Sequence, residues 1–166
     1  MKPSDIKSMT ARIHPDQSNV VCEPEVNKKR PQNAYDAQFS VHYIMAASLT
    51  RGRFTLDELE DDALSDPTIL DLCGKSGYEI DPDSAYPKYY SGEVIIETMD
   101  GRRLSHREAI NRGSADNPVS IADIEDKFFA NATRTVSNNK AKEVRTAVMS
   151  LEEHDPLRSL ADAIAT

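Results

Sequence analysis

Apolar residues recur at helical spacing from Pro31 to Gly52, the one stretch where this pattern is long enough to predict a long helix. Residues three and four positions apart lie on the same face of an α-helix. Gly52 comes directly after the pattern, where glycine commonly ends a helix. We therefore expect one long helix that packs closely through a face of small and apolar residues. This face consists of Ala34, Ala37, Val41, Ile44 and Ser48, widened by Met45 and Leu49.

Alternation of apolar and polar residues predicts strands on both sides of this helix. Lys7 to His14 alternates over its whole length and predicts a strand with one solvated face. Lys75 to Ile80 predicts a short strand. Two alternating runs between Gly92 and Ile110 flank Asp100-Gly101, which predicts a hairpin closed by a two-residue type I′ turn.

Capping signals predict the remaining helices. Thr55 to Glu58 forms a capping box that opens a short acidic helix, and Asp66-Pro67 starts another helix. Ser120 caps a longer helix, and two more amphipathic pieces follow it. The segment from His14 to Asn33 contains three prolines and many polar residues, so we expect a long irregular connection there.

The order of these elements is strand, loop, helices, strand, hairpin and helices. It predicts an α+β fold, a two-layer sandwich in which a mostly antiparallel sheet has helices packed on one face. A chain of 166 residues is long enough to bury a substantial core and short for two large domains. We therefore expect a single α+β domain over residues 1–166.

Composition excludes several classes of protein. The formal net charge of −8 argues against a nucleic-acid partner, because binding to phosphates requires clustered Lys and Arg. No run of residues is long and apolar enough to cross a membrane. Two distant cysteines, Cys22 and Cys73, indicate reduced thiols in a cytoplasmic protein. The four histidines lack metal-ligand spacing and no glycine-rich phosphate loop is present, so we expect neither a metal nor a cofactor.

Candidate chemistry lies on the predicted long helix and just before it. His42 flanks the apolar face of the helix, where it could act as a base or be a histidine satisfied at an interface. Lys29 and Arg30 precede the start of the helix and could bind a carboxylate together with free backbone N–H groups. The acidic residues that follow are interpreted as a solvated face; they are Glu58, Glu60, Asp61 and Asp62.

The predicted long helix carries Tyr35-Asp36-Ala37-Gln38-Phe39-Ser40 and then Tyr43, Ala46-Ala47, Leu49 and Gly52, preceded by Arg30-Pro31. This pattern resembles the signature of the MmgE/PrpD family, which includes relatives of 2-methylcitrate dehydratase and cis-aconitate decarboxylase. Weaker matches follow in the family's order, namely the strand and hairpin from Val94 to Gly101 and a Gly-x-x-x-Asn-Pro-x-Ser turn from Gly113 to Ser120. The resemblance covers nearly the whole chain. Its most specific residues are Asp36, Ala37, Gln38, Phe39 and Ser40.

The resemblance implies that this chain corresponds to the C-terminal, smaller domain of a two-domain enzyme. Family members are usually homodimers in which an all-helical N-terminal domain, absent from this sequence, carries most of the catalytic histidines and lysines. They abstract a proton next to a carboxylate of a small di- or tricarboxylate. The substrate then loses water, loses carbon dioxide or is reprotonated. The resemblance also implies a tyrosine from this domain, for which Tyr43 is the closer match and Tyr35 the weaker.

Two hypotheses follow. The first is a domain or small subunit of an MmgE/PrpD-type lyase or isomerase that completes its active site with a helical partner and is inactive alone. The second is a non-enzymatic interaction or regulatory module that keeps the fold.

Overall fold

The computed structural model describes residues 1–151 and 156–165, which gather into two compact units, Met1–Asn117 and Pro118–Thr166. The first unit contains η1 (Pro3–Asp5), β1 (Ile6–Ile13), α1 (Pro15–Val21), α2 (Glu25–Lys28), α3 (Ala34–Gln38), α4 (Val41–Arg51), η2 (Leu56–Leu59), α5 (Asp61–Leu64), α6 (Pro67–Gly74), β2 (Ser76–Ile80), β3 (Gly92–Thr98) and β4 (Arg103–Glu108). The second contains α7 (Ile121–Ala132), α8 (Asn138–Met149) and α9 (Pro156–Ile164).

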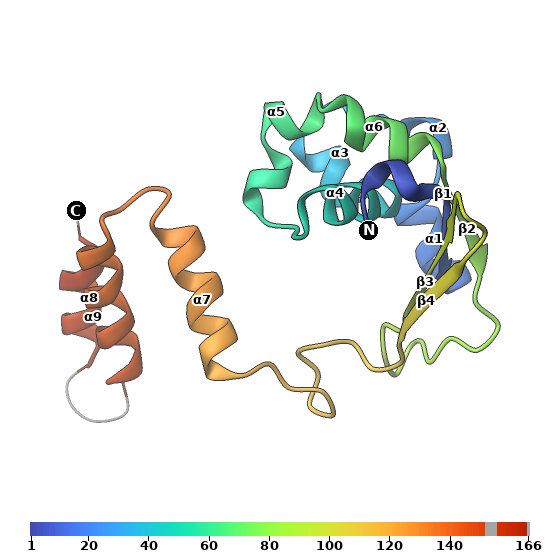
Figure 1. The fold of residues 1–166 in the computed structure, drawn as a ribbon. Helices are drawn as coiled ribbons and strands as arrows, with labels where there is room; N and C mark the ends of the chain where they lie inside the picture. The colour runs from blue at the N-terminus through green and yellow to red at the C-terminus, as the bar shows by residue number, and fades with distance from the viewer. Residues whose placement is uncertain (152–155, 166) are drawn as a thin grey trace. The chain divides into compact units, whose positions relative to one another are not determined.

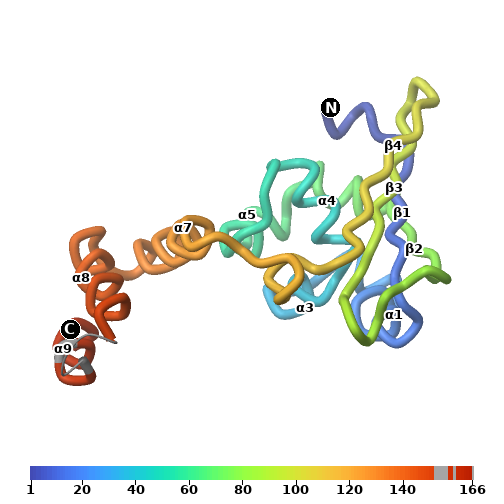
Figure 2. Tube along the Cα trace, turned by 90° about the horizontal axis from the view of Figure 1, so that it is seen from below, coloured from blue at the N-terminus to red at the C-terminus, as the bar shows by residue number. Residues whose placement is uncertain are grey.

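The sheet of the first unit has the strand order β2-β1-β3-β4. Strand β1 pairs in parallel with β2 and antiparallel with β3, and β3 pairs antiparallel with β4. Helices α3 to α6 lie together on one side of this sheet (Figure 1), and the four strands run side by side in Figure 2. The predicted α+β class is confirmed.

The core forms where the sheet meets these helices. Ile6 and Met9 of β1 and Ile96 of β3 pack against buried side chains of the helical layer. Small residues line the helix side of this contact, since Ala37, Ala46 and Ala47 are fully buried. The buried face of α4 is nevertheless not the predicted one, because Ala46 and Ala47 lie outside that face, while Ala34 is exposed and Ile44 only partly buried. Close packing of this kind brings the α4 backbone near the sheet and α6.

The predicted long helix is in fact two helices, α3 and α4, because the chain bends at Phe39 and Ser40. Ser40 has extended backbone angles, and its hydroxyl accepts a hydrogen bond from the Tyr43 backbone N–H at 3.0 Å. This makes Ser40 an N-cap, which ends one helix and begins the next. The apolar spacing continues across the bend, so periodicity alone does not reveal it.

The segment predicted to be irregular, His14 to Asn33, contains two short helices, α1 and α2. Pro15 occupies the first position of α1, where its missing N–H costs nothing. The His14 ring accepts a hydrogen bond from the Asp16 N–H at 3.2 Å and caps this helix. Pro15 and Pro24 therefore stand at helix starts, which corrects the interpretation of the segment as wholly irregular.

The β3–β4 hairpin is present, but its turn differs from the predicted type I′ turn. Gly101 has a φ of 84°, whereas no non-glycine residue that the structure describes has a positive φ. The Gly101 N–H donates to the Thr98 carbonyl, and the Thr98 N–H donates to the Arg102 carbonyl. This is a three-residue loop in which a tight turn is followed by a left-handed glycine.

A row of alternating charges crosses the four strands. Glu79, Arg12, Glu93 and Arg107 lie in register on β2, β1, β3 and β4, respectively. Neighbouring groups approach to 3.2 Å (Arg12–Glu79), 3.4 Å (Arg12–Glu93) and 3.6 Å (Arg107–Glu93). Arg107 also donates to the buried carboxylate of Asp81 at 2.8 Å, which ties the end of β2 to β4.

The second unit is formed by helices alone. Ser120 caps α7 and Ser137 caps α8, and α8 packs against α9. Among the helices described over residues 1–151 and 156–165, none is both long and apolar enough to cross a membrane.

Candidate functional site

The three consecutive cations before α3 have different roles. The Lys28 ammonium donates to the Val20 carbonyl at 2.6 Å and to the Phe39 carbonyl at 2.7 Å. These carbonyls lie at the carboxyl ends of α1 and α3, where a positive charge is stabilising. Ser40 in turn donates its hydroxyl to the Lys28 carbonyl. Lys28 therefore links three short helices and is not available for a ligand.

Lys29 and Arg30, the two predicted carboxylate-binding residues, also differ. Lys29 forms an ion pair with Glu25 at 2.9 Å. Arg30 is exposed, and among the residues that the structure describes its guanidinium has no ion-pair partner. It lines a polar hollow of about 430 Å³ together with Glu23, Asn27, Gln32 and Asp36.

The remaining motif residues shape the backbone around this hollow. The Asp36 carboxylate accepts hydrogen bonds from the Gln32 N–H at 3.1 Å and from the Asn33 amide at 3.2 Å, which folds the segment after Arg30. Ala37 is fully buried in the core. These contacts give the motif a local structural role and present Arg30 at the edge of the hollow.

His42 is completely buried on α4. The Ser76 hydroxyl donates to the Cys73 carbonyl at 2.6 Å, so the 2.7 Å contact between Ser76 and His42 is donated by Nδ1 of the imidazole. The other nitrogen, Nε2, is buried and has no hydrogen-bond partner among the described residues. Burial lowers the pKa of His42, and nearby Lys29 lowers it further, against the opposing effects of Glu25, Glu23 and the Cys22 carbonyl. The ring is therefore neutral near pH 7, with a free lone pair that solvent does not reach.

The side chains of the two tyrosine candidates lie in different surroundings from that of His42. Tyr43 is fully buried, and its hydroxyl donates to the Glu58 carbonyl at 2.7 Å. Burial raises the pKa of Tyr43 to about 12. Tyr35 is 68% exposed on α3 and packs its ring on Phe39 at 5.0 Å. The structure thus places Tyr43, His42 and Tyr35 in three different surroundings and does not bring them together around one cavity.

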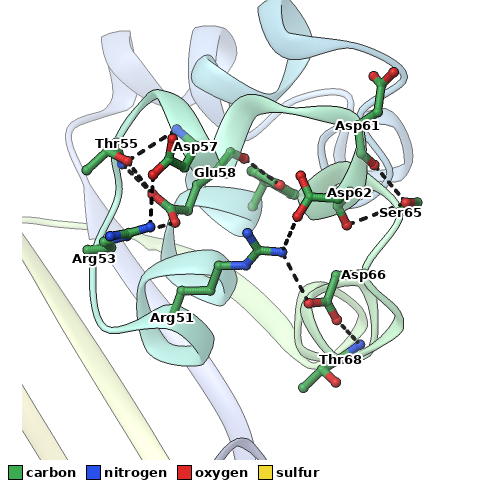
Figure 3. Close-up of polar contacts among 11 residues, drawn as sticks. Arg51, Arg53, Thr55, Asp57, Glu58, Asp61, Asp62, Ser65, Asp66 and Thr68 are labelled. Carbon is green, nitrogen blue, oxygen red and sulfur yellow. Dashed lines mark hydrogen bonds and ion pairs between the residues drawn. The ribbon is translucent and has the colours of Figure 1, made fainter. Parts of the chain in front are cut away.

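The interpretation of the acidic segment after α4 as a solvated face is wrong for Glu58, although Glu60, Asp61 and Asp62 are exposed. The carboxylate of Glu58 is buried and accepts hydrogen bonds from the Thr55 N–H at 2.7 Å and hydroxyl at 2.8 Å, and Arg53 approaches it at 3.3 Å (Figure 3). Burial would raise the pKa of Glu58, but these hydrogen bonds outweigh it and the pKa is lowered. In the same view Arg51 reaches Asp62 at 3.1 Å. This network anchors the end of α4 and carries no free catalytic group.

A second concavity in the first unit is apolar, and sequence reasoning missed it. It is an open groove of about 820 Å³ between α1, α4 and strands β1, β3 and β4. The residues of α1 form one of its walls, and this helix is absent from the sequence-based prediction. The amphipathic pattern of the residues after Pro15 is the sequence signal that could have revealed this helix. Representative lining residues are Val20, Phe39, Ile44, Tyr90, Val94 and His106.

Metal binding has no support in the described part of the chain, since its His, Cys, Asp and Glu side chains form no group that could hold an ion. The two cysteines are buried, and burial raises the pKa of Cys22 to about 11 and that of Cys73 to about 12. Both thiols are therefore protonated at neutral pH, which makes them poor nucleophiles.

Comparisons with known proteins identify the family. The family described as MmgE/PrpD C-terminal domain matches residues 1–153. Cis-aconitate decarboxylase of Mus musculus is 28% identical over 130 residues, which cover 77% of this chain and 26% of the relative. The Homo sapiens protein of the same name is 27% identical over 130 residues, covering 77% and 27%. The cis-aconitate decarboxylase-like protein oryM of Aspergillus oryzae is 26% identical over 126 residues, covering 75% and 26%.

The chain thus spans about a quarter of the length of these relatives. Among the residues that carry the resemblance in the sequence, Asp36 shapes the hollow beside Arg30 and Ser40 caps α4, whereas Ala37 is buried in the core and Phe39 lines the apolar groove. On the strength of the match over residues 1–153, this chain belongs to the MmgE/PrpD family and carries its C-terminal domain.

Proposed function

We propose that this chain forms one wall of the active site of an MmgE/PrpD-type lyase or isomerase that acts on small di- or tricarboxylates. Family membership supports the enzyme class, and the names of the relatives point to cis-aconitate and its close analogues as substrates. On this proposal the other wall, with the catalytic base, comes from a helical partner domain or subunit.

The observation that carries the proposal is the guanidinium of Arg30, which lies at the polar hollow and has no ion-pair partner within residues 1–151 and 156–165. Arginine presents a planar fork of N–H donors that matches the two oxygens of a carboxylate. Lys28 and Lys29, its neighbours, are already held by carbonyls and by Glu25. Arg30 is therefore the residue of this segment that can bind one carboxylate of the substrate.

A base is the second requirement of proton abstraction, and it must reach the substrate. His42 and Tyr43 are fully buried, and neither lines the hollow beside Arg30. The two acidic groups at the hollow are engaged by other contacts, since Glu23 accepts from Tyr78 and Asp36 from the Gln32 N–H, so on this proposal the base comes from the partner. In this scheme Arg30 orients the substrate and the partner carries out the acid/base steps.

The test is a titration of the purified chain with cis-aconitate, followed by calorimetry, and an assay of the chain for turnover of cis-aconitate and 2-methylcitrate. We expect measurable binding, no turnover, and a loss of affinity of about tenfold or more in Arg30→Ala, because a charge-assisted contact is removed. Arg103→Ala on β4, outside the hollow, is the matched control and keeps the affinity. Unchanged affinity in Arg30→Ala removes Arg30 from the site, and turnover by the chain alone removes the need for a partner.

A non-enzymatic module is the second candidate, and the burial of His42 and Tyr43 favours it. On that alternative the hollow has no affinity for carboxylates and the fold serves only to bind another protein. Absence of cis-aconitate binding in the same titration would support it over the lyase.

A further inference from the structure

The apolar groove of the first unit leaves large hydrophobic side chains open to solvent. Val20 is 54% exposed, Phe39 37% and Tyr90 62%, and all three line the groove. Leu104, 41% exposed, lies two residues before His106 on β4, so the two side chains share a face of the strand and extend the apolar surface along it. Exposed aromatic and aliphatic side chains gathered around one concavity are typical of an interaction surface.

The charges around the groove exclude a polycarboxylate as its occupant. Asp16 and Glu108 are among its lining residues, and Glu108 accepts a hydrogen bond from the Asn117 amide at 3.1 Å. A third lining carboxylate, Glu93, is paired with Arg12 and Arg107. The one Lys or Arg among the lining residues is Arg12, whose guanidinium is held by Glu79 and Glu93 in the cross-strand row. An anionic ligand would meet two carboxylates and no free cation here, whereas a ligand with cationic ends would be attracted.

We propose that the groove is the docking surface for an amphipathic segment of a partner protein, with an apolar face and Lys or Arg at its ends. The open shape and the extension to Leu104 suit a helix or chain segment better than a small molecule. The carboxylates of Asp16 and Glu108 select the basic ends. This inference does not depend on the proposed lyase activity, because no substrate takes part in it.

The test uses three synthetic peptides and the purified chain. The first peptide carries leucines at helical spacing with lysines at both ends, the second has glutamates in place of the lysines, and the third has the lysines but a scrambled order of leucines. We expect the first to bind one-to-one, with NMR shift changes at Val20, Ile44 and Val94. The second and third should bind about tenfold more weakly or worse.

Variants of the chain locate the surface. Val20→Thr and Leu104→Thr, both at exposed positions, should weaken binding of the lysine peptide, whereas Met99→Thr in the β3–β4 turn, 69% exposed and outside the groove, should leave it unchanged. Asp16→Asn combined with Glu108→Gln should reduce the preference for lysine over glutamate ends. Far-UV circular dichroism checks that each variant is folded.

Several results would overturn the inference. They are the absence of binding by the lysine peptide, equal affinity for both charged peptides, and shift changes that map outside the groove. A dimer of the chain, seen by sedimentation and lost in Val20→Thr and Leu104→Thr, would assign the groove to a second copy of this protein instead.

Discussion

His42 illustrates how one buried side chain couples stability to pH. Its imidazole is neutral in the folded chain because burial disfavours the charged form, while Nδ1 holds Ser76 and Nε2 has no partner among the described residues. In the unfolded chain the ring is solvated and has the ordinary histidine pKa of about 6.5. At a pH between the lowered pKa of the folded chain and the ordinary pKa of the unfolded chain, the unfolded state binds the proton and the folded state does not.

The free energy of unfolding should therefore fall as the pH drops from about 6.5 towards the lowered pKa of His42. His42→Asn should be less stable than the parent at pH 7, since it loses the contact with Ser76, but it should lose less stability over this range. Urea unfolding at a series of pH values measures both the stability at pH 7 and its change with pH. His106→Asn, at a highly exposed position, is the control and should keep the parent's pH dependence. A pH dependence of the unfolding free energy that is as steep in His42→Asn as in the parent contradicts this account.

At the scale of residues, sequence reasoning placed His42 beside the apolar face of its helix but could not decide between a base and a buried histidine. The deciding facts are its contacts with Ser76 and Cys73, which come from a distant part of the sequence. The same holds for Lys28, Lys29 and Arg30. The sequence-based prediction named Lys29 and Arg30 as carboxylate-binding residues, and the contacts of the folded chain leave only Arg30 free of an ion pair or carbonyl within the described residues.

At the scale of elements, the cross-strand row of charges makes the sheet depend on Arg107. Asp81 is buried at the end of β2, and its pKa is lowered by the hydrogen bond from Arg107, against the opposing effect of burial. Removing the guanidinium leaves a buried carboxylate without its cation, which is far more costly than losing an exposed pair.

Arg107→Met should lower the free energy of unfolding at pH 7 by about 2 kcal/mol, a value reduced because Arg107 is itself partly exposed. Lys7→Met is the matched control, because Lys7 and Glu97 form an exposed pair at 3.9 Å, and it should change stability by less than about 0.5 kcal/mol. Urea unfolding of the two variants compares them directly. Equal effects would mean that the buried pair contributes no more than a surface pair.

Two glycines at helix ends should respond in opposite directions to the same substitution. Gly52, after α4, has a φ of 74°, and a Cβ there would meet no atom within 4 Å. Gly52→Ala should therefore cost about 1 kcal/mol through backbone conformation alone. Gly74 ends α6 without a positive φ and has equally open space, so Gly74→Ala should add about 0.5 kcal/mol. Thermal unfolding of both variants is the measurement, and shifts of the same sign would contradict the argument.

Element prediction succeeded where a local signal was strong and failed where short elements depend on tertiary contacts. The alternation of β1, β3 and β4 and the capping box at Thr55 identified their elements correctly. Helices α1 and α2 were missed because they have only seven and four residues, so any apolar pattern in them is weak, and contacts such as that of Lys28 in α2 with the Val20 carbonyl of α1 are not visible in the sequence. The bend at Ser40 was missed because serine is compatible with both a helix interior and an N-cap.

At the scale of the whole molecule, buried side chains are distributed unevenly between the two units. The main core cluster lies entirely within Met1–Asn117. In the described part of Pro118–Thr166, Ala141 is the one buried residue. Helices that bury so little apolar surface gain too little to offset the entropy of ordering their backbone.

The first unit should therefore fold without the second. A chain ending at Asn117 should keep a cooperative urea transition within about 1 kcal/mol of the parent, since no residue of its core is removed. A chain ending at Arg102, which lacks β4 and Arg107, should lose the transition because the buried Asp81 loses its cation and β3 loses its hydrogen-bonded neighbour at the sheet edge. In the intact chain, amide hydrogens of α7 and α8 should exchange much faster than those of β1 and β3, because local opening exposes little apolar surface. Slow exchange in α7, or a large loss of stability on truncation at Asn117, would show that the second unit contributes to the folding of the first.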